Sequence, residues 1–560
     1  QTSATYCSPR RSANVKMSVV TGSWVADVLL LTAFLLYLLH RKLTSTHGYF
    51  KGRGIPYLVP YSLLGNFTVQ IKAAADQATF LYNSFPGERF FGFFLLKVPI
   101  LVVKDPSLIQ QMLVKDFAHF HDRGFNTQLD GLLSMSLFML KGEPWRSLRY
   151  KLSPTFTSGK LKLMFHQIVN SGNRLLESIE ESLGETVDAK MIAHAFVMEV
   201  IASTAFGLNF NRNNPEAEEF LNKSLIATKP TFLMKIKFIL ILIVPKLMRW
   251  LNMSILSSEV ENYFLNLTIS TKEYRKKNNI KRDDYFQLLL TLQEAEENGK
   301  SLLSTVGDKT EEDALINQMN YAPQTLQEKD TKLMTDRCVT AQTLIFLTGG
   351  SDSVSSTLMF ALYHIAKDPV VQEKSAQEVL STLAKHGDLT YQAVKDMAYL
   401  DLILQETLRL YPPNPVGMRE CTTPYHIPDS DIVLEKGLFI TIPIRGLHMD
   451  PKVYPDPEVF NPGRFIGNNY KPNAMYLPFG DGPRICIAMR FAILEMKVCL
   501  AKLVSQYTIE VNQKTQHPFT FDSKSFAPSP VGGIWLNFRK RPKTTDGDIG
   551  KGDVLNTDNA

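Results

Sequence analysis

The chain has few cysteines, and they form no paired motif. The five cysteines are odd in number and lie far apart, at Cys7, Cys338, Cys421, Cys486 and Cys499. The absence of a C-x-x-C pair and the scattered spacing argue against both structural zinc and a disulfide framework. We therefore expect the folded body to lie in a reducing compartment.

The sequence also lacks a strong excess of one charge. Its 61 Lys and Arg residues against 55 Asp and Glu residues give a net charge of +6, which is spread along the chain. No block of Lys and Arg is interleaved with aromatic residues in the way that follows a nucleic-acid backbone. Nucleic acid is therefore excluded as a partner.

No linker divides the chain into domains. A length of 560 residues would suggest about three or four domains at roughly 150 residues each. However, apolar and polar residues alternate from residue 49 to residue 538 with one long polar interruption, at residues 294–332. We therefore predict one large folded unit over residues 43–541. Residues 542–560 are polar and free of aromatic residues, which predicts a disordered tail.

One apolar run near the N-terminus is long enough to cross a membrane. Residues 19–39 carry a single charge, Asp27, and would form a helix about 31 Å long. Basic residues follow it, so the positive-inside rule places the body in the cytosol. We predict a membrane anchor at residues 17–42, with Met17 as the natural start and residues 1–16 outside the working protein. A cleaved signal peptide and an acid-free mitochondrial transit segment are the alternatives.

The strongest chemical signal is a glycine-rich turn around one cysteine. Residues 479–488 read FGDGPRICIA. Glycines let the backbone bend tightly around the sulfur of Cys486. A helix beginning at about Ile487 would point its positive end at that sulfur, which favours the thiolate. Taken alone, a cysteine before a helix is most often a buried structural residue.

Two helical patterns add to this signal. Residues 405–413, QETLRLYPP, place Glu406 and Arg409 one turn apart on a helix that the prolines end. An exposed pair of this kind is common and contributes only about 0.2–0.5 kcal/mol. Residues 341–358 begin as an amphipathic helix and then admit Gly349, Gly350 and several hydroxyls. Such a departure from helix propensity often marks function, and the alternative is a kinked core helix.

These motifs together resemble the cytochrome P450 family. Phe479, Gly482, Arg484 and Cys486 match its haem-loop pattern F-x-x-G-x-R-x-C-x-G, and Ala488 replaces the last glycine. The resemblance implies that Cys486 is the thiolate ligand of the iron of haem b. It also implies a mainly helical fold with small β-sheets (α+β) in a single haem domain.

The resemblance assigns a buried charge triad to three distant residues. Arg409 lies 77 residues before Cys486, where the family keeps its Glu/Arg pair, so Glu406 and Arg409 would be two members. Residues 460–465, FNPGRF, would supply the third through Arg464, although Gly463 replaces the usual acidic residue. Because a buried triad is costly unless fully paired, its expected role is to position the haem loop.

The resemblance also implies a distal helix and haem-propionate ligands. Gly349, Gly350, Asp352 and Ser353 match the distal motif (A/G)-G-x-(D/E)-T, in which Asp352 and Ser353 would relay protons to bound dioxygen. Serine replaces the usual threonine, which puts the efficiency of proton delivery in question. Trp145 and Arg149 match the W-x-x-x-R helix that binds haem propionates, and Arg123 is a further candidate. Surface salt bridges are the alternative role for both arginines.

The resemblance covers residues 54–541 and extends to partners. Residues 153–162 and 352–355 are most similar to microsomal members of the clan that holds insect detoxification families and a mammalian drug-metabolising family. The insect family numbered nine is the most similar. The implied enzyme inserts one oxygen atom of O2 into lipophilic xenobiotic or endogenous substrates at the cytosolic face of the endoplasmic reticulum. Since the chain has no nucleotide or flavin motif, electrons from NADPH would come through NADPH–cytochrome P450 reductase, with cytochrome b5 as a further partner.

Several alternatives stay open. The apolar run at residues 238–244 is too short to span a bilayer, and it is either a lipid-facing loop flanked by basic residues or a buried core helix. Pocket residues can be assigned only to residues 124–138, 416–419 and 527–533. An isomerase or dehydratase of peroxide substrates is a second function, against which the Asp352 and Ser353 pair argues. A non-catalytic haem binder or sensor is a third.

Overall fold

The computed structural model of the chain describes residues 21, 23–124, 131–208, 215–228, 237, 240, 245–251, 253–299 and 333–542. The predicted leader at residues 1–16 and the tail from residue 543 onward lie outside these residues. So does the apolar run at residues 238–244, apart from residue 240. The predictions made for these segments therefore stay predictions.

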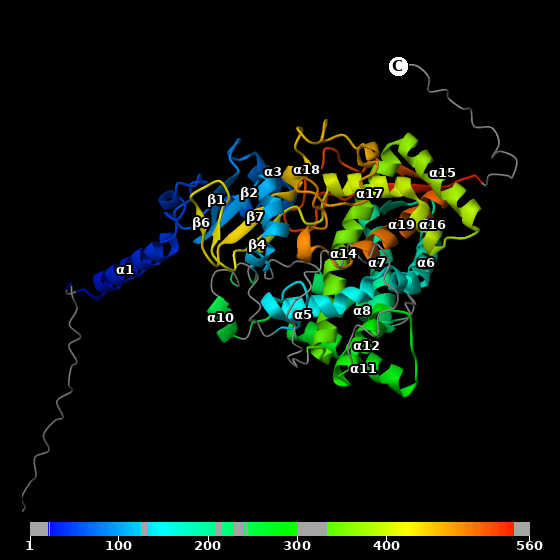
Figure 1. The fold of residues 1–560 in the computed structure, drawn as a ribbon, viewed down its shortest axis with the longest axis horizontal. Coiled ribbons are helices and arrows are strands. Elements are labelled where there is room, and N and C mark those ends of the chain that lie inside the picture. Colours follow the sequence, from blue (N-terminus) through cyan, green and yellow to red (C-terminus); the bar gives the residue numbers. More distant parts are fainter. Residues whose placement is uncertain are drawn as a thin grey trace, which may run out of the picture.

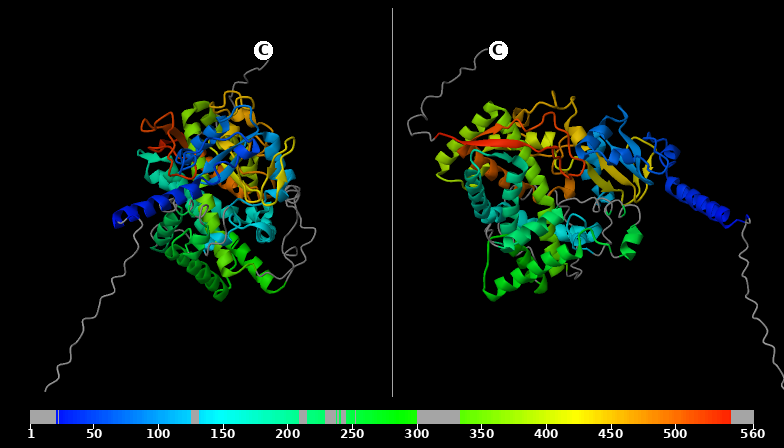
Figure 2. Two further views of the ribbon diagram at one scale, coloured as in Figure 1. Left: turned by 90° about the vertical axis from the view of Figure 1, so that its left-hand side faces the viewer. Right: turned by 180° about the vertical axis from the view of Figure 1, so that it is seen from behind.

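Helix α1 (Trp24–Thr44) projects from one side of the body (Figure 1 and Figure 2). None of its residues is buried, and its 21 residues, which include an 18-residue window of mean hydropathy 1.5, could cross a membrane by length and composition. It ends two residues beyond Lys42, where the anchor was predicted to end. Thr21 donates hydrogen bonds of 2.9 and 2.8 Å to the carboxylate of Asp27, which keeps this acid at the helix N-terminus, where negative charge is favourable.

Helices form most of the body. The longer ones are α3 (Ala74–Asn83), α5 (Gly142–Leu152), α6 (Ser158–Glu181), α7 (Ala189–Ala205), α8 (Pro215–Thr228), α11 (Ser258–Lys277), α12 (Tyr285–Glu297), α14 (Asp336–Lys367), α15 (Pro369–His386), α17 (Ala398–Leu410) and α19 (Met489–Gln506). The shorter ones are α2 (Phe67–Gln70), α4 (Pro106–Gln110), α10 (Pro245–Trp250), α16 (Tyr391–Asp396) and α18 (Ile444–His448). Short 3₁₀ or π turns connect them: η1 (Lys51–Arg53), η2 (Gln111–Lys115), η3 (Phe117–His119), η4 (Leu132–Met135), η5 (Ser153–Phe156), η7 (Pro462–Phe465) and η8 (Gly482–Arg484).

The strands form three small sheets. The first joins β1 (Phe90–Leu95), β2 (Val98–Val103), β7 (Phe439–Ile442) and β4 (Gly417–Glu420) in that order, with β2 and β7 parallel and the other pairs antiparallel. The second joins β3 (Thr186–Asp188), β9 (Trp535–Lys540) and β8 (Tyr507–Val511), and the third β5 (Tyr425–His426) and β6 (Val433–Leu434). Figure 1 shows the first sheet on the side of α1 and most helices on the other side. The predicted mainly helical fold with small sheets is confirmed.

Helix α14 runs through the middle of the helical part. It has 32 residues, those from 354 to 365 are all buried, and it packs against α7, α17 and α19. Ser353 donates its hydroxyl to the carbonyl of Gly349 (2.7 Å), and Thr357 donates to that of Ser353 (2.9 Å). The hydroxyls are thus satisfied within the helix, which continues through the glycines that were expected to weaken it.

Candidate functional site

The predicted cysteine loop is a closed turn that packs on η2. Gly482 has a φ of 66°, and a Cβ there would lie 2.0 Å from the carbonyl oxygen of Leu113. Only glycine fits both conditions. The N–H of Cys486 donates a 2.9 Å hydrogen bond to the carbonyl of Phe479, which closes the turn around the sulfur.

The helix after the loop begins at Met489, two residues later than predicted. Ala488 precedes it with φ −96° and ψ 15°, a backbone that does not require the glycine usual at this place. Burial raises the pKa of the Cys486 thiol, whereas the N–H of Ala488 and the charges of Arg149 and Arg123 lower it. Burial is the larger effect and the pKa is raised overall, so these three groups offset it only in part.

The cysteine loop and the central helix each have an exposed position among buried or half-buried neighbours. The side chain of Cys486 is exposed, although burial raises its pKa and Arg484 and Ile485 beside it are buried. Gly349 is exposed in the middle of α14, and a Cβ there would meet nothing within 4 Å. One turn before it, Phe346 packs on Phe491 of α19 with ring centroids 5.1 Å apart. The central helix therefore packs on α19, the helix that follows the cysteine loop.

Arg484 binds the cysteine loop to the chain segment that precedes α5. Its guanidinium donates to the carbonyls of His121 and Leu140, each at 2.7 Å, and lies 3.5 Å from Asp122. It also lies 3.9 Å from the ring centroid of Trp145, a cation–π contact. Arg123 donates a 3.0 Å hydrogen bond to the carbonyl of Arg484 itself. Trp145 thus packs on the loop.

Four arginines gather near Cys486 with too few anionic partners. Burial, followed by neighbouring arginines, lowers the pKa of Arg484 to about 7 and that of Arg123 to about 9. Burial lowers the pKa of Arg149 and of Arg419 to about 10 each. Among the described residues, the buried Nε atoms of Arg149 and Arg419 have no hydrogen-bond acceptor. A nearby anion would offset this loss of hydration and favour the charged guanidinium groups, so the cluster suits a ligand that brings its own carboxylates.

The structure brings the predicted charge triad together. Arg409 donates to both oxygens of Glu406, at 2.7 and 2.8 Å, and Arg464 donates to the same carboxylate at 3.1 Å. His448 pairs with the carbonyl of Arg409 (3.2 Å) and accepts the N–H of Leu477 (2.8 Å). Because Leu477 lies two residues before Phe479, His448 links the triad to the start of the cysteine loop.

Asp352 is held from two sides on the segment of α14 that carries Gly349. Its Oδ1 lies 2.8 Å from Nζ of Lys190 in the first turn of α7. Its Oδ2 accepts a 3.2 Å hydrogen bond from the N–H of Ala527. The neighbouring Ser353 donates to the carbonyl of Gly349. Both predicted relay residues thus lie about one turn from the exposed Gly349. The carboxylate of Asp352 is already bound to Lys190 and Ala527.

Comparison with known proteins decides the family. The sequence profile of the family described as Cytochrome P450 matches residues 56–536. This chain belongs to the cytochrome P450 family. It is 34% identical to the probable cytochrome P450 6a14 of Drosophila melanogaster over 526 residues, covering 90% of this chain and 97% of the relative. The cytochrome P450 6B1 of Papilio polyxenes is 33% identical (92% and 99% covered), and the cytochrome P450 9e2 of Blattella germanica is also 33% identical (89% and 95%).

Membership makes this P450 a haem monooxygenase, and its residues fit the cofactor. Cys486 offers an accessible thiol next to groups that favour its thiolate. Among the described residues, the buried Nε atoms of Arg149 and Arg419 have no acceptor, and haem carries two propionates that would offer acceptors. The identities to these relatives do not separate the insect family numbered six from that numbered nine. These relatives therefore do not single out family nine, which was expected to be the most similar family.

Two members of the charged cluster near Cys486 were not predicted from the sequence motifs. Asp122, which pairs with Arg484, stands beside Arg123 in the sequence but was given no role. Arg419 on β4 was noted only as part of a pocket segment. The available signal for Arg419 was a charged residue that shares one face of a short strand with Gly417 and with Cys421 just beyond its end, since a charge on a buried face needs a partner.

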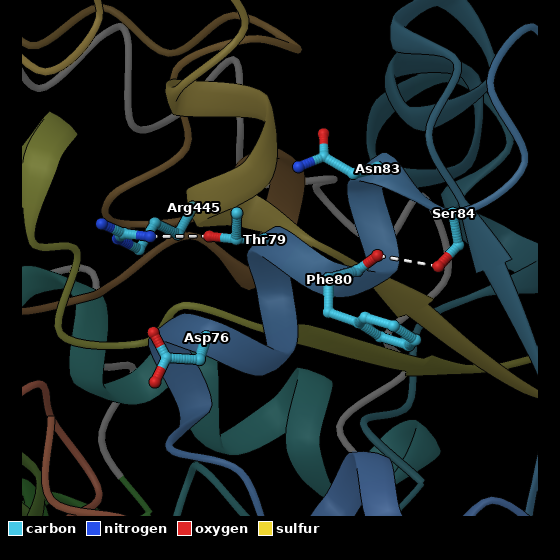
Figure 3. A pocket seen from close by; sticks show the side chains of 6 residues that line it. All are labelled: Asp76, Thr79, Phe80, Asn83, Ser84 and Arg445. Atoms are coloured by element: carbon cyan, nitrogen blue, oxygen red, sulfur yellow. Dashed lines mark hydrogen bonds between the residues drawn. The ribbon is translucent and has the colours of Figure 1, made fainter. Parts of the chain in front are cut away.

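A surface hollow lies outside this site. Figure 3 shows it between α3 and α18, with Arg445 donating a 2.6 Å hydrogen bond to Thr79. Its lining residues are Asp76, Thr79, Phe80, Asn83, Ser84 and Arg445. None of them is a predicted site residue, so the hollow is not assigned to the haem site.

Proposed function

We propose that this P450 inserts one oxygen atom of O2 into lipophilic substrates, xenobiotic or endogenous, with electrons from NADPH delivered by NADPH–cytochrome P450 reductase. The observation that carries the proposal is the placement of Asp352 and Ser353 beside the open space at Gly349. A proton-delivering pair at that place is needed for oxygen activation and not for cofactor binding alone.

The residues that would hold the cofactor follow from the cluster around Cys486. Its thiolate would bind the iron, and Arg149 and Arg123 would bind the propionates through charge-assisted hydrogen bonds. Trp145 would support Arg484, which together with Phe479 and Gly482 keeps the loop in shape. Haem, when bound, supplies the binding and activation of dioxygen.

The remaining site residues would move protons and hold the loop. Ser353, whose hydroxyl already bonds to the helix carbonyl of Gly349, would present its proton toward the open space. Asp352 would resupply that proton when its contact with Lys190 opens. Glu406, Arg409 and Arg464 would act at a distance, by fixing the segment that leads into Phe479.

A docking face for the electron donor is expected outside the cysteine loop. Helix α6 packs on α19 and η2 packs on η8, and α6 and η2 carry the exposed basic residues Lys162 and Lys115. An acidic partner surface suits this face, and cytochrome b5 would be a second donor there. Charge reversal at Lys115 or Lys162 should weaken reductase binding more at low salt than at high salt.

The anchor and the domain boundaries form part of the same proposal. Residues 17–42 would cross the endoplasmic reticulum membrane, residues 43–541 would form the haem domain on the cytosolic face, and residues 1–16 and 542–560 would lie outside it. Deleting residues through Lys42 should release the catalytic body from its stable membrane attachment. Partial association of the truncated body with vesicles would support a lipid-facing run at residues 238–244, and a fully soluble body would favour a buried run. Nearest kinship to the insect family numbered nine also stays part of the proposal.

Reconstitution with reductase tests the function. Lipophilic probes should first be screened by the shift in haem spin state, and the best binders then incubated with reductase, NADPH and O2. Oxygenated product that depends on all three supports the proposal. Conversion of a peroxide substrate without reductase or O2 would favour an isomerase or dehydratase. Binding of probes without product in any combination would favour a haem sensor.

A further inference from the structure

A hairpin near the C-terminus reaches the central helix beside Asp352. The N–H of Val531 donates to the carbonyl of Thr520, and that of Asp522 donates to Ser529, each at 2.8 Å. Residues 520–531 therefore form two paired arms with a tip at residues 523–528. At this tip, Ala527 and Pro528 are buried.

Two hydrogen bonds fasten the tip to α14. The N–H of Ala527 donates to Oδ2 of Asp352 at 3.2 Å, and the hydroxyl of Ser356 donates to the carbonyl of Pro528 at 2.7 Å. Asp352 and Ser356 lie one turn apart on the same face of the helix. Ser356 is fully buried and Ala527 is only 4% exposed, so water does not readily replace the hydroxyl of Ser356 when its bond to Pro528 breaks.

The carboxylate of Asp352 is thus fixed between the hairpin and α7. Lys190 holds Oδ1, and Asp188 caps the N-terminus of α7 just before it. Gly533, which follows the hairpin, packs so closely that a Cβ would lie 2.8 Å from the carboxylate of Asp188. The hairpin therefore meets both elements that position Asp352, and any shift of its tip alters the contact to Oδ2.

We propose that the hairpin tip positions Asp352 for proton delivery and that Ser356 is the positioning residue that holds the tip. The inference rests on the proposed function, in which Asp352 and Ser353 deliver protons to bound dioxygen. Ser356 touches neither substrate nor cofactor in this role. Its hydroxyl holds Pro528, the next residue Ala527 then stays within reach of Asp352, and the carboxylate keeps one orientation.

The chain offers a matched control for the test. Ser355 is as deeply buried as Ser356, but its hydroxyl donates to the carbonyl of Ser351 within the helix (2.6 Å). Amide exchange of the segment 521–533 in the haem-loaded full chain should become roughly tenfold faster in Ser356→Ala, because a buried hydrogen bond is lost. It should stay near the wild-type rate in Ser355→Ala. Hydrogen peroxide released per NADPH should rise about twofold or more in Ser356→Ala alone.

Two further variants keep the test decisive. Ser356→Thr retains the hydroxyl and should restore both readouts, and Ser356→Cys keeps the volume with a weaker donor if alanine lowers the yield of folded enzyme. Equal amide-exchange rates of residues 521–533 in wild type, Ser355→Ala and Ser356→Ala would show that Ser356 does not hold the hairpin tip. Faster exchange with unchanged peroxide release would overturn the link to proton delivery. A wild-type enzyme that consumes no NADPH with reductase would contradict the proposed function itself. Amide exchange would still show whether Ser356 holds the hairpin tip.

Discussion

Glu406 and Arg409 form a two-point ion pair that is closed off from solvent. The two nitrogen–oxygen distances are 2.7 and 2.8 Å, and neither side chain has exposed surface. Glu143 and Arg146 on α5 have the same spacing and a 2.6 Å contact, but Glu143 is 66% exposed. The two pairs therefore compare one sequence spacing in two environments.

Breaking the buried pair should destabilise the protein far more than breaking the exposed one. Glu406→Gln leaves Arg409 buried without a counter-charge, which should lower the free energy of unfolding by about 3–5 kcal/mol. Glu143→Gln should lower it by at most about 0.5 kcal/mol. Chemical unfolding followed by circular dichroism, with the haem content of the purified proteins, measures both. Similar losses in the two variants would contradict a special role for the buried pair.

Replacing Cys486 should remove thiolate ligation. Cys486→Ala is expected to abolish the long-wavelength band of the ferrous–CO complex, because no other described cysteine lies in a comparable loop. Cys421→Ala is the control, since burial raises the pKa of the Cys421 thiol to about 11 and its thiol donates to the carbonyl of Thr423. A thiolate band that survives in Cys486→Ala would show that the ligand is misassigned.

Removing one charge from the arginine cluster should weaken haem binding without destabilising the haem-free chain. Arg149→Gln loses a charge-assisted contact to a propionate, so haem should leave the protein roughly tenfold faster. The haem-free chain should not lose stability, because one of several crowded buried cations is gone. Haem transfer to apomyoglobin and unfolding of the haem-free chain measure the two effects. Arg146→Gln, one turn earlier on α5, should leave haem transfer unchanged.

Acid should weaken the fold through Asp122. Burial alone would raise the pKa of this carboxyl, but hydrogen bonds from His121 and Gly142 and the charge of Arg484 bring it below its ordinary value of 3.8. The ionised form therefore stabilises the fold above about pH 4, and this contribution is lost as the pH falls through the lower, folded pKa.

Asp122→Asn should accordingly lower the free energy of unfolding at about pH 6 and make little difference near pH 2. Urea unfolding across this range measures the change. Asp396→Asn is an exposed comparison, because hydrogen bonds from Gln392 and His386 lower its pKa on the surface. Its effect should be small and should vanish in about 1 M salt. If Asp122→Asn lowered the free energy of unfolding equally at every pH, the stabilising role of the ionised Asp122 carboxylate would be wrong.

Substituting Ser353 should change the amount of product formed per NADPH consumed and leave haem binding unchanged. Threonine's β-branch restricts χ1, whereas serine samples more rotamers, so the hydroxyl is correctly placed less often. Ser353→Thr should raise product formed per NADPH, and Ser353→Ala should lower it. The change should stay below about tenfold, since rotamer preferences are worth a few tenths of a kcal/mol. Product, peroxide and NADPH should be measured together, and equal coupling in wild type and Ser353→Ala would remove Ser353 from the proton route.

The parts of the site that sequence could predict are local ones. The cysteine loop occupies ten consecutive residues, and the spacing of Glu406 and Arg409 is a single helical turn, so both are visible in the chain itself. The start of α19 was placed two residues too early because Ala488 keeps a non-helical backbone. That backbone depends on how the closed turn packs, which no local pattern encodes.

Contacts between distant segments could not be predicted in this way. Nothing in the sequence around Asp122 indicates that its carboxylate meets Arg484, more than 360 residues later. Arg419 reaches the cluster through the order of strands in the first sheet. Ser356 looked like one more helix hydroxyl until the fold placed Pro528 against it. Such side chains acquire their roles from tertiary packing.

The unburied helix α1 has a kinetic consequence. A body held by one helix stays within a few nanometres of the bilayer but is free to turn, so its encounters become a search across a surface. If α1 crosses a membrane as proposed, lipophilic molecules in the lipid and electron donors anchored in the same membrane would meet the body at an effective concentration near the millimolar range. Under such tethering, a weak and short-lived contact at the basic face is enough for repeated electron transfer, and tight docking would slow the exchange of donors.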